Sequence, residues 1–207
     1  MKVINEVMRY LTGALLPFAI MVSCATISEL RVNYQLPPGS EELRGLKVFL
    51  RFEEARTVKD ILSEKARKEF QHFSENISFS MARDQEESFM VGIYDVPSLF
   101  KEVFKIRLES LGAEIVMGRE KGDNEMVIVL RDLILDLPGK NWHVIVDFEV
   151  RLIKNERVLA KQMISGQGER LKLLGHKQAG IVMGEIFTDT VNRVDIKRLF
   201  KQAGLQR

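Results

Sequence analysis

The chain has 207 residues and a mass of 23.8 kDa, enough for one medium-sized domain with its own hydrophobic core. Lysine and arginine number 31 against 29 for aspartate and glutamate, and 45% of the residues are apolar. This balance excludes a disordered polyelectrolyte and a protein of several membrane spans. A net charge of +2 also argues against nucleic acid as a partner, which needs a strongly positive surface.

The N-terminal residues have the three parts of an export signal. Basic residues precede an uncharged run over 10–22, and small residues follow at 23–25. The run is shorter than the ~20 residues of a membrane-spanning helix, and Gly13 and Pro17 interrupt it. We therefore expect residues 1–23 to be a signal peptide that is removed on export.

Cys24 is the single cysteine of the chain and ends the sequence Met21-Val22-Ser23-Cys24. These residues resemble a bacterial lipobox, although methionine stands where leucine is usual. In such lipoproteins a dedicated signal peptidase cuts before the cysteine, which then carries acyl chains. The resemblance implies lipidation at Cys24 and a firm hold on a membrane, at ~0.8 kcal/mol per buried methylene. Two alternatives stay open: Ser23-Cys24-Ala25 also suits ordinary signal peptidase, which would release a soluble protein, or the thiol is an ordinary buried one.

The segment after the signal predicts a tether. With one cysteine, the mature chain cannot form an internal disulfide. Ala25 replaces the aspartate that keeps many enterobacterial lipoproteins in the inner membrane, so by resemblance we expect the periplasmic face of the outer membrane. Residues 24–45 are polar, contain Pro37-Pro38-Gly39-Ser40 and lack a sustained period, which indicates a lipidated tether. The folded domain is predicted to start at Leu46.

Residues 46–207 are predicted to form a single α+β domain. Alternating or continuous apolar runs predict strands over 46–53, 77–81, 89–94, 113–117, 126–135, 142–152 and 158–165. Helical periodicity predicts helices over 58–73, 95–112 and 176–194, and a short last helix capped by Asp195. We expect a mostly antiparallel sheet of four to six strands, packed against a central helix and a C-terminal helix.

Side chains that carry catalysis or bind metals are sparse. The chain has no HExxH motif and no Gly-x-Ser-x-Gly elbow, and its histidines lack metal-ligand spacing: His72, His143 and His176. Gly166-Gln167-Gly168 lacks the third glycine and the lysine of a phosphate-binding loop, and favours a strand that bends or ends there. We therefore predict no catalytic residue, no metal site and no cofactor.

Other polar or aromatic residues suit structural roles better than chemical ones. Asp132 and Asp136 share one face of a predicted strand and could simply edge the sheet. Glu54 and Arg56 are typical of a local ion pair at a strand end. Trp142 opens the most regular strand, which favours a core position over an interface anchor.

Three segments carry a family resemblance. They are Ser98-Leu-Phe-Lys-Glu-Val-Phe104, Leu108-Glu-Ser-Leu-Gly112 and Gly184-Glu-Ile-Phe-Thr188. With the element order and the lipobox, they resemble YajG-type periplasmic lipoproteins and, more distantly, the auxiliary lipoproteins of envelope lipid-transport systems. The resemblance covers roughly residues 46–194 and lies in helix ends and apolar stripes, which are common features. Those families largely lack an assigned enzymatic activity, so Cys24 is the one site residue that the resemblance transfers.

These observations lead to one leading hypothesis and two alternatives. We expect a non-enzymatic lipoprotein, anchored to the membrane through its N-terminal lipid, that binds or supports an envelope protein in lipid transport or membrane assembly. The first alternative is a module for a small ligand or a lipid, with an apolar site between the core helix and the sheet. The second, a hydrolase, needs two carboxylates, or a serine and a histidine, that converge in a cleft.

Overall fold

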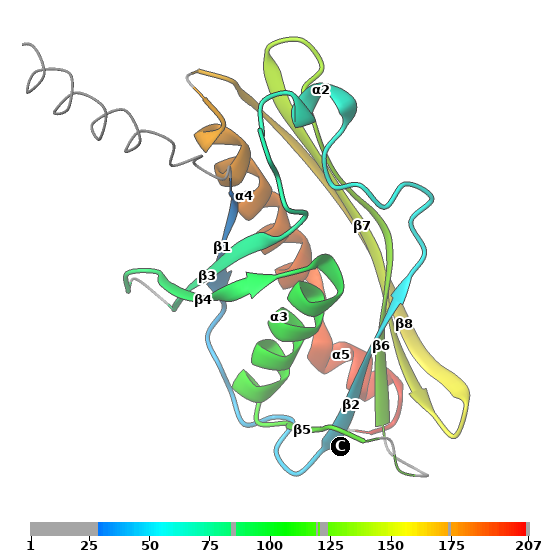
Figure 1. Ribbon diagram of the computed structural model, residues 1–207. Helices are drawn as coiled ribbons and strands as arrows, with labels where there is room; N and C mark the ends of the chain where they lie inside the picture. The colour runs from blue at the N-terminus through cyan, green and yellow to red at the C-terminus, as the bar shows by residue number, and fades with distance from the viewer. Residues whose placement is uncertain (1–28, 84–85, 119, 121–123, 174, 206–207) are drawn as a thin grey trace, which may run out of the picture.

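The computed structural model describes residues 29–83, 86–118, 120, 124–173 and 175–205 (Figure 1). The elements in chain order are β1 (Leu30–Leu36), β2 (Lys47–Glu54), α2 (Glu64–Arg67), β3 (Ile77–Arg83), β4 (Phe89–Tyr94), α3 (Val96–Ser110), β5 (Glu114–Val116), β6 (Asn124–Asp136), β7 (Asn141–Lys154), β8 (Arg157–Leu171), α4 (Lys177–Arg193) and α5 (Ile196–Gln202). The described strands form two sheets, β1-β3-β4 and β5-β2-β6-β7-β8. The predicted α+β class is confirmed.

Strand β1 corrects the predicted tether. Its seven residues pair in parallel with β3, and its inward side chains, Leu30, Val32, Tyr34 and Leu36, are buried. The burial alternates along the strand because successive side chains point to opposite faces. The prediction that residues 24–45 form a tether is therefore wrong from the start of β1 onward. The partner strand is distant in the sequence, so no local pattern indicates the pairing.

The larger sheet combines parallel and antiparallel pairs. β2 lies between β5 and β6 and is parallel to both, whereas β6, β7 and β8 form an antiparallel meander. A two-residue hairpin turn follows β7: Asn155 and Glu156 both have left-handed φ angles, 49° and 66°, as such a turn between twisted strands requires. The antiparallel character that we predicted thus holds for the second half of this sheet.

The helix predicted over 58–73 is wrong, because only the four residues of α2 are helical there. Before α2, the backbone pairs with the end of β6: Ser63 N donates to Leu135 O at 3.0 Å, and Leu135 N donates to Ile61 O at 2.7 Å. Ser63 then caps α2, since its Oγ accepts from Ala66 N. Leu62, Ala66 and Phe70 are buried as the helical pattern suggested, but mostly irregular chain carries them, and Val58 is 59% exposed.

The core lies between the two sheets, where α3 and α4 fill the space (Figure 1). Asp95 caps α3 by accepting from Ser98 N at 2.8 Å. The ring of Phe100 contacts Phe148 of β7 and Phe187 of α4, with centroids 5.6 and 5.4 Å apart. One side chain of α3 therefore touches both the large sheet and the second helix.

Helix α4 packs closely on β8 because two glycines lie beneath it. A Cβ atom at Gly168 would lie 2.5 Å from Ile186 Cδ1, and one at Gly166 would overlap the Cγ2 methyl group of Thr190. β8 runs through both positions without ending, which corrects the prediction that the strand bends or ends there. The two glycines leave space that lets α4 pack close to β8.

Candidate functional site

The structure does not bring the predicted chemical residues together. Cys24 lies outside the described residues. The ring of His176 packs against that of Phe70, with centroids 4.8 Å apart, whereas His143 lies on β7 and His72 is exposed. Within the described ranges, no group of three or more His, Cys, Asp or Glu side chains could hold a metal ion.

The aspartates of β6 have separate surroundings. Asp136 accepts hydrogen bonds from Ser63 Oγ and, at 2.8 Å, from Leu137 N, so it fixes the end of the strand. Asp132 lies opposite Asp147 across the β6–β7 pair. The role of Asp136 is thus structural, as its position at the edge of the sheet predicted.

Two structural predictions are confirmed at Trp142 and Arg56. Trp142 is fully buried, and its ring contacts Phe70 at a centroid distance of 5.8 Å. Arg56 donates from Nε and Nη2 to the carboxylate of Glu54 at 2.8 and 2.7 Å. These hydrogen bonds lower the pKa of Glu54, despite the opposing effect of its partial burial.

A groove of about 1200 Å³ lies between the exposed face of β1 and the outer flank of α4. We call it the β1–α4 groove. It is lined by Glu29, Arg31, Asn33, Gln35, His176, Lys177, Gly180, Ile181, Gly184, Glu185, Thr188, Asp189 and Asn192. Its volume is larger than the roughly 300–1,000 Å³ of typical ligand pockets, and it lies on one face of the strand that we had expected to be a tether.

Small residues at every fourth position of α4 place the helix along the backbone of β1. A Cβ atom at Gly180 would lie 2.7 Å from Arg31 O, and one at Gly184 would lie 2.9 Å from Asn33 O. Only glycine allows so close an approach of a helix to a strand. The strand and the helix therefore meet without intervening side chains, and the meeting line forms the floor of the groove.

Hydrogen bonds close the edge of β1 farther along α4. Asn192 Nδ2 donates to Gln35 O at 2.9 Å, and Tyr34 Oη donates to Asn192 Oδ1 at 2.7 Å. Thr188 Oγ1 accepts from Gln35 N at 3.3 Å. Burial raises the pKa of Tyr34, which keeps its hydroxyl protonated as a donor. Because these hydrogen bonds pair backbone polar groups at the edge of β1, the strand forms a fixed wall of the groove.

The lining of the groove is chemically mixed. Arg31 and Lys177 supply positive charge, Glu29 and Glu185 supply negative charge, and Ile181 is apolar and 38% exposed. The described lining contains no serine and no cysteine. Such a surface offers ion pairs and hydrogen bonds to an extended polar partner, and it lacks the nucleophile of a serine or thiol hydrolase.

The apolar ligand site predicted between the core helix and the sheet is filled by side chains. Phe104 of α3 packs against Phe148 of β7 with centroids 5.9 Å apart, and both rings are fully buried. A ligand at this place would have to displace packed rings. The groove therefore lies outside the core, on the far side of α4.

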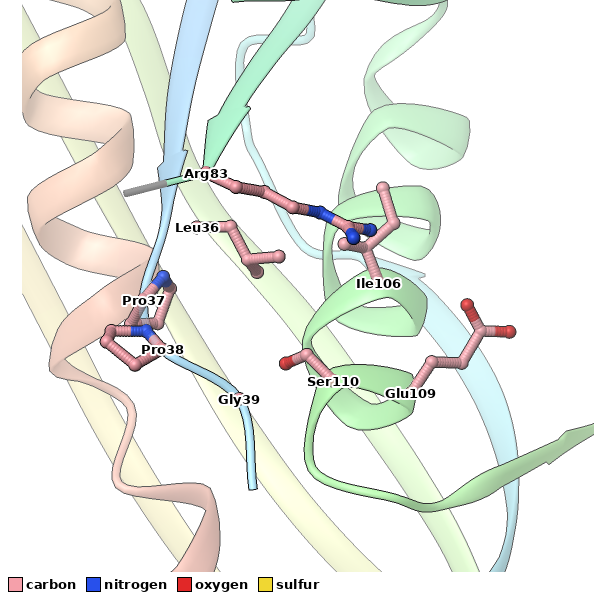
Figure 2. A pocket seen from close by; sticks show the side chains of 8 residues that line it. All are labelled: Leu36, Pro37, Pro38, Gly39, Arg83, Ile106, Glu109 and Ser110. Atoms are coloured by element: carbon pink, nitrogen blue, oxygen red, sulfur yellow. The ribbon is translucent and has the colours of Figure 1, made fainter. Parts of the chain in front are cut away.

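A second hollow, of about 410 Å³, lies where β1 and β3 end beside α3 (Figure 2). The side chain of Arg83 extends from β3 toward Ile106, with Glu109 farther along α3 (Figure 2). Its base is closed by a hydrogen bond from Ser40 N to Ser110 O, 2.8 Å long. This hollow is smaller and contains one basic and one acidic side chain.

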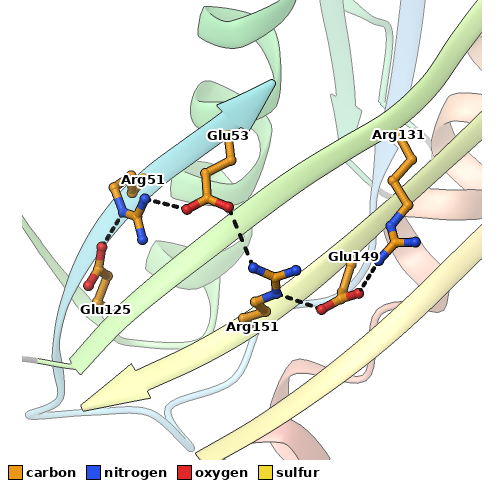
Figure 3. A network of polar contacts seen from close by, with 6 residues as sticks. All are labelled: Arg51, Glu53, Glu125, Arg131, Glu149 and Arg151. Atoms are coloured by element: carbon orange, nitrogen blue, oxygen red, sulfur yellow. Dashed lines mark hydrogen bonds and ion pairs between the residues drawn. The ribbon is translucent and has the colours of Figure 1, made fainter. Parts of the chain in front are cut away.

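Six charged side chains form a network across the outer face of the larger sheet (Figure 3). They connect in the order Glu125, Arg51, Glu53, Arg151, Glu149 and Arg131. Glu149 is 2% exposed. Its carboxylate accepts hydrogen bonds from Arg151 Nε at 2.6 Å and from Arg131 Nη2 at 2.7 Å. The hydrogen bond from Arg151 is the main cause of a lowered pKa of Glu149.

The sequence contained a partial signal for this network. Charged residues alternate on the polar face of β2 and again on that of β7. The order of the strands in the sheet determines which charged side chains meet. That strand order was not predictable from the sequence. The network joins three arginines to three glutamates, so their formal charges sum to zero.

No described helix is both long enough and apolar enough to cross a membrane. No family model matches the chain, and neither does any curated protein. Among solved structures, the crystal structure of protein XCC0632 from Xanthomonas campestris, of family DUF330, aligns with a TM-score of 0.52 over 87% of this chain and 97% of that one. The two chains share a fold. Their sequences are 12% identical, so the likeness extends to the fold alone.

A homolog of a neuraminyllactose-binding hemagglutinin from Helicobacter pylori also aligns, over 82% of this chain and 97% of that one. The TM-score is 0.37 at 11% identity, which is too low to establish a shared fold. Neither structure confirms the finer resemblance to YajG-type lipoproteins.

Proposed function

We propose that the protein is a non-enzymatic lipoprotein, held at the periplasmic face of the outer membrane by acyl chains on Cys24, that binds an envelope protein in the β1–α4 groove. The groove carries this proposal, because its walls are fixed by glycine contacts and hydrogen bonds before any partner arrives. Preformed walls reduce the loss of conformational freedom on binding. An accessory role in lipid transport or membrane assembly follows from the resemblance to the auxiliary lipoproteins.

The composition of the groove supports a protein partner. Charged and amide side chains of β1 face charged side chains of α4 across a floor of small residues. Non-obligate protein interfaces have a similar mixture of polar and apolar surface. A peptide segment that lay along the groove would find carboxylates, cations and amides on both sides.

Photo-crosslinking in cells tests the groove. A benzoylphenylalanine at Ile181 should form one discrete adduct with an envelope protein, and the same probe at Met163, exposed on β8, should not. Asn33→Arg, which fills the groove from β1, should abolish the adduct, whereas the control Lys161→Glu should leave it unchanged. Equal adducts from both probe positions, or an adduct that survives Asn33→Arg, would contradict a partner site in the groove.

Substitution of Cys24 tests the anchor. The wild-type protein should begin at an acylated Cys24 by mass spectrometry, and Cys24→Ala should keep its leader and incorporate no labelled palmitate. Ser23→Ala is the matched control and should be acylated like the wild type. A soluble periplasmic protein that begins at Thr26 would show cleavage by ordinary signal peptidase and end the anchoring proposal.

The volume of the groove, about 1200 Å³, keeps a lipid or small ligand as a second candidate function. A lipid headgroup could pair with Arg31 or Lys177, with an acyl chain against Ile181. Native mass spectrometry of the purified protein should then show a bound lipid that Ile181→Glu removes. Protein that purifies without any bound mass would contradict this candidate.

A further inference from the structure

We propose that one end of the domain rests directly on the bilayer surface through a patch of two leucines and two lysines, Leu171, Leu173, Lys140 and Lys177. We call it the membrane-facing patch. The inference rests on the proposed acylation of Cys24 and adds to it: the lipid anchor attaches the chain, and the patch sets which end of the domain faces the membrane.

The chain between the proposed anchor and the fold is short. β1 begins at Leu30, six residues after Cys24. Six residues span at most about 22 Å when fully extended. The end of the domain at which β1 begins must therefore stay close to the bilayer that holds the acyl chains.

The membrane-facing patch lies at this same end of the domain. The first turns of α4 are beside the start of β1, since a Cβ atom at Gly180 would lie 2.7 Å from Arg31 O. The connection from β8 to α4 leads into these turns, and Lys172 N donates to Lys140 O at 2.8 Å, which brings the β6–β7 turn alongside. Figure 1 shows the orange β8–α4 connection and the start of β1 at one end of the molecule.

The side chains of the patch combine apolar and basic character. Leu171, the last residue of β8, is 52% exposed, and Leu173, in the connection that precedes the exposed Lys177, is 65% exposed. Lys140 is exposed in the neighbouring turn, and neither it nor Lys177 has an ion-pair partner among the described residues. Exposed leucines flanked by unpaired lysines are what an interfacial membrane contact requires, because the leucines enter the headgroup region and the lysines attract anionic lipids.

The patch is held rigidly on the domain. Lys172 Nζ forms an ion pair with Glu69 at 2.6 Å, and the ring of His176 packs on that of Phe70. Phe70 packs in turn on the buried Trp142. The leucines are therefore presented on a fixed base, and no segment has to fold when the patch meets a bilayer.

Met117 provides a matched control. It is apolar and 97% exposed, and it follows β5, at the opposite end of the molecule from the β8–α4 connection (Figure 1). A bare tendency of exposed apolar side chains to enter lipid would affect this position at least as much as Leu173. If the domain has a fixed orientation, position 173 should contact the lipid and position 117 should not.

The experiment places a fluorescent label at either position in the full, acylated protein. Leu173→Cys and Met117→Cys are each labelled with a nitrobenzoxadiazole group; acylated Cys24 has no free thiol, so the label attaches at one place. The proteins are reconstituted in vesicles of phosphatidylcholine and phosphatidylglycerol that contain nitroxide-labelled lipid. Quenching should remove about half of the fluorescence at position 173 and about a tenth or less at position 117.

The outcomes separate this inference from the proposed function. Equal and weak quenching at both positions, in protein that floats with the vesicles and carries acyl chains, overturns the patch and leaves the anchor intact. Protein that does not float and has an unmodified Cys24 overturns the anchor, and the patch with it. Lys140→Glu with Lys177→Glu should reduce the quenching at position 173 about threefold in these vesicles; an unchanged value overturns the role of the two lysines.

Discussion

Arg107 shows how a single buried cation completes a helix in this protein. It is 7% exposed and donates from Nη1 to two carbonyl oxygens at the end of α4, those of Val191 and Val194. The last carbonyls of a helix lack partners within the helix and carry partial negative charge. A guanidinium on α3 therefore fixes the end of α4, and this position could not be recognised from the periodicity of either helix.

Replacement of Arg107 by methionine should destabilise the fold by about 1–3 kcal/mol, because buried carbonyl groups would lose a charged donor. Urea denaturation at neutral pH measures the loss. Lys105→Met on the same helix is the control: its ion pair with Glu102 is partly exposed, at 3.4 Å, and its removal should change stability by about 0.5 kcal/mol or less. Equal effects of the two substitutions would show that Arg107 does not hold α4.

Glu149 should make stability depend on pH. Its hydrogen bond from Arg151 lowers its pKa in the folded protein below that of the unfolded chain. The folded state thus gains stability that is fully present above the unfolded carboxyl pKa, about 4.3, and is lost as the pH falls through the folded value. Glu149→Gln should cost about 1–3 kcal/mol at pH 7, and this difference should shrink toward pH 3.

Urea denaturation of both proteins at several pH values tests the prediction for Glu149. Glu169→Gln, at an exposed position of β8, should follow the wild-type curve throughout. A Glu149→Gln deficit that stays constant down to the acid end would mean that its carboxylate charge is not what stabilises the network.

Among the elements, the contact of α4 with β8 is the tightest point of the packing. Gly166→Ala should destabilise the protein by about 1–3 kcal/mol, because the new methyl group would overlap Thr190 Cγ2. Thr190→Ser removes that methyl group, so the double variant should recover part of the loss in a mutant cycle. Gly118→Ala, with open space around the position, should be neutral. Strict additivity of the Gly166 and Thr190 effects would contradict the predicted clash.

The elements that the sequence predicted well are those whose signals are local. Helix α3 has its cap at Asp95 and a left-handed Gly112, with φ of 88°, just after its end. Helix α4 and the β7–β8 hairpin likewise lie where their patterns indicated. The failures, the tether over 24–45 and the helix over 58–73, occur where buried apolar residues depend on a partner distant in the sequence. In both cases tertiary contacts determined the backbone conformation.

For the whole molecule, β1 is an integral part of the domain. A chain that begins at Ala25 should unfold cooperatively like the mature protein. A chain that begins at Leu46 lacks β1, which exposes the backbone edge of β3 and empties the sites of buried residues such as Tyr34. We expect it to aggregate or to lose its near-ultraviolet circular dichroism. Equal folding of both chains would restore the view of this segment as a tether.

The candidate site depends on the same long-range arrangement. The groove combines positions 29–35 with positions 176–192, which come together only because β1 joins the small sheet and α4 lies along it. The sequence indicated the apolar stripe of α4, but it could not indicate that α4 lies beside β1. Cys24 is the reverse case, because its proposed acylation was predicted from a short motif and needs no information about the fold.

The parallel pairing of β1 with β3 has a mechanical consequence. A pull along the axis of β1 from its N-terminal side would reach the fold first at Leu30. The hydrogen bonds between the two strands would then bear the load together in shear, with the contact between Asn192 and Gln35 resisting beside them. In a hairpin pulled open from its ends, the inter-strand hydrogen bonds break one after another. The parallel pairing of β1 with β3 therefore resists such a pull better than a hairpin pulled from its ends would.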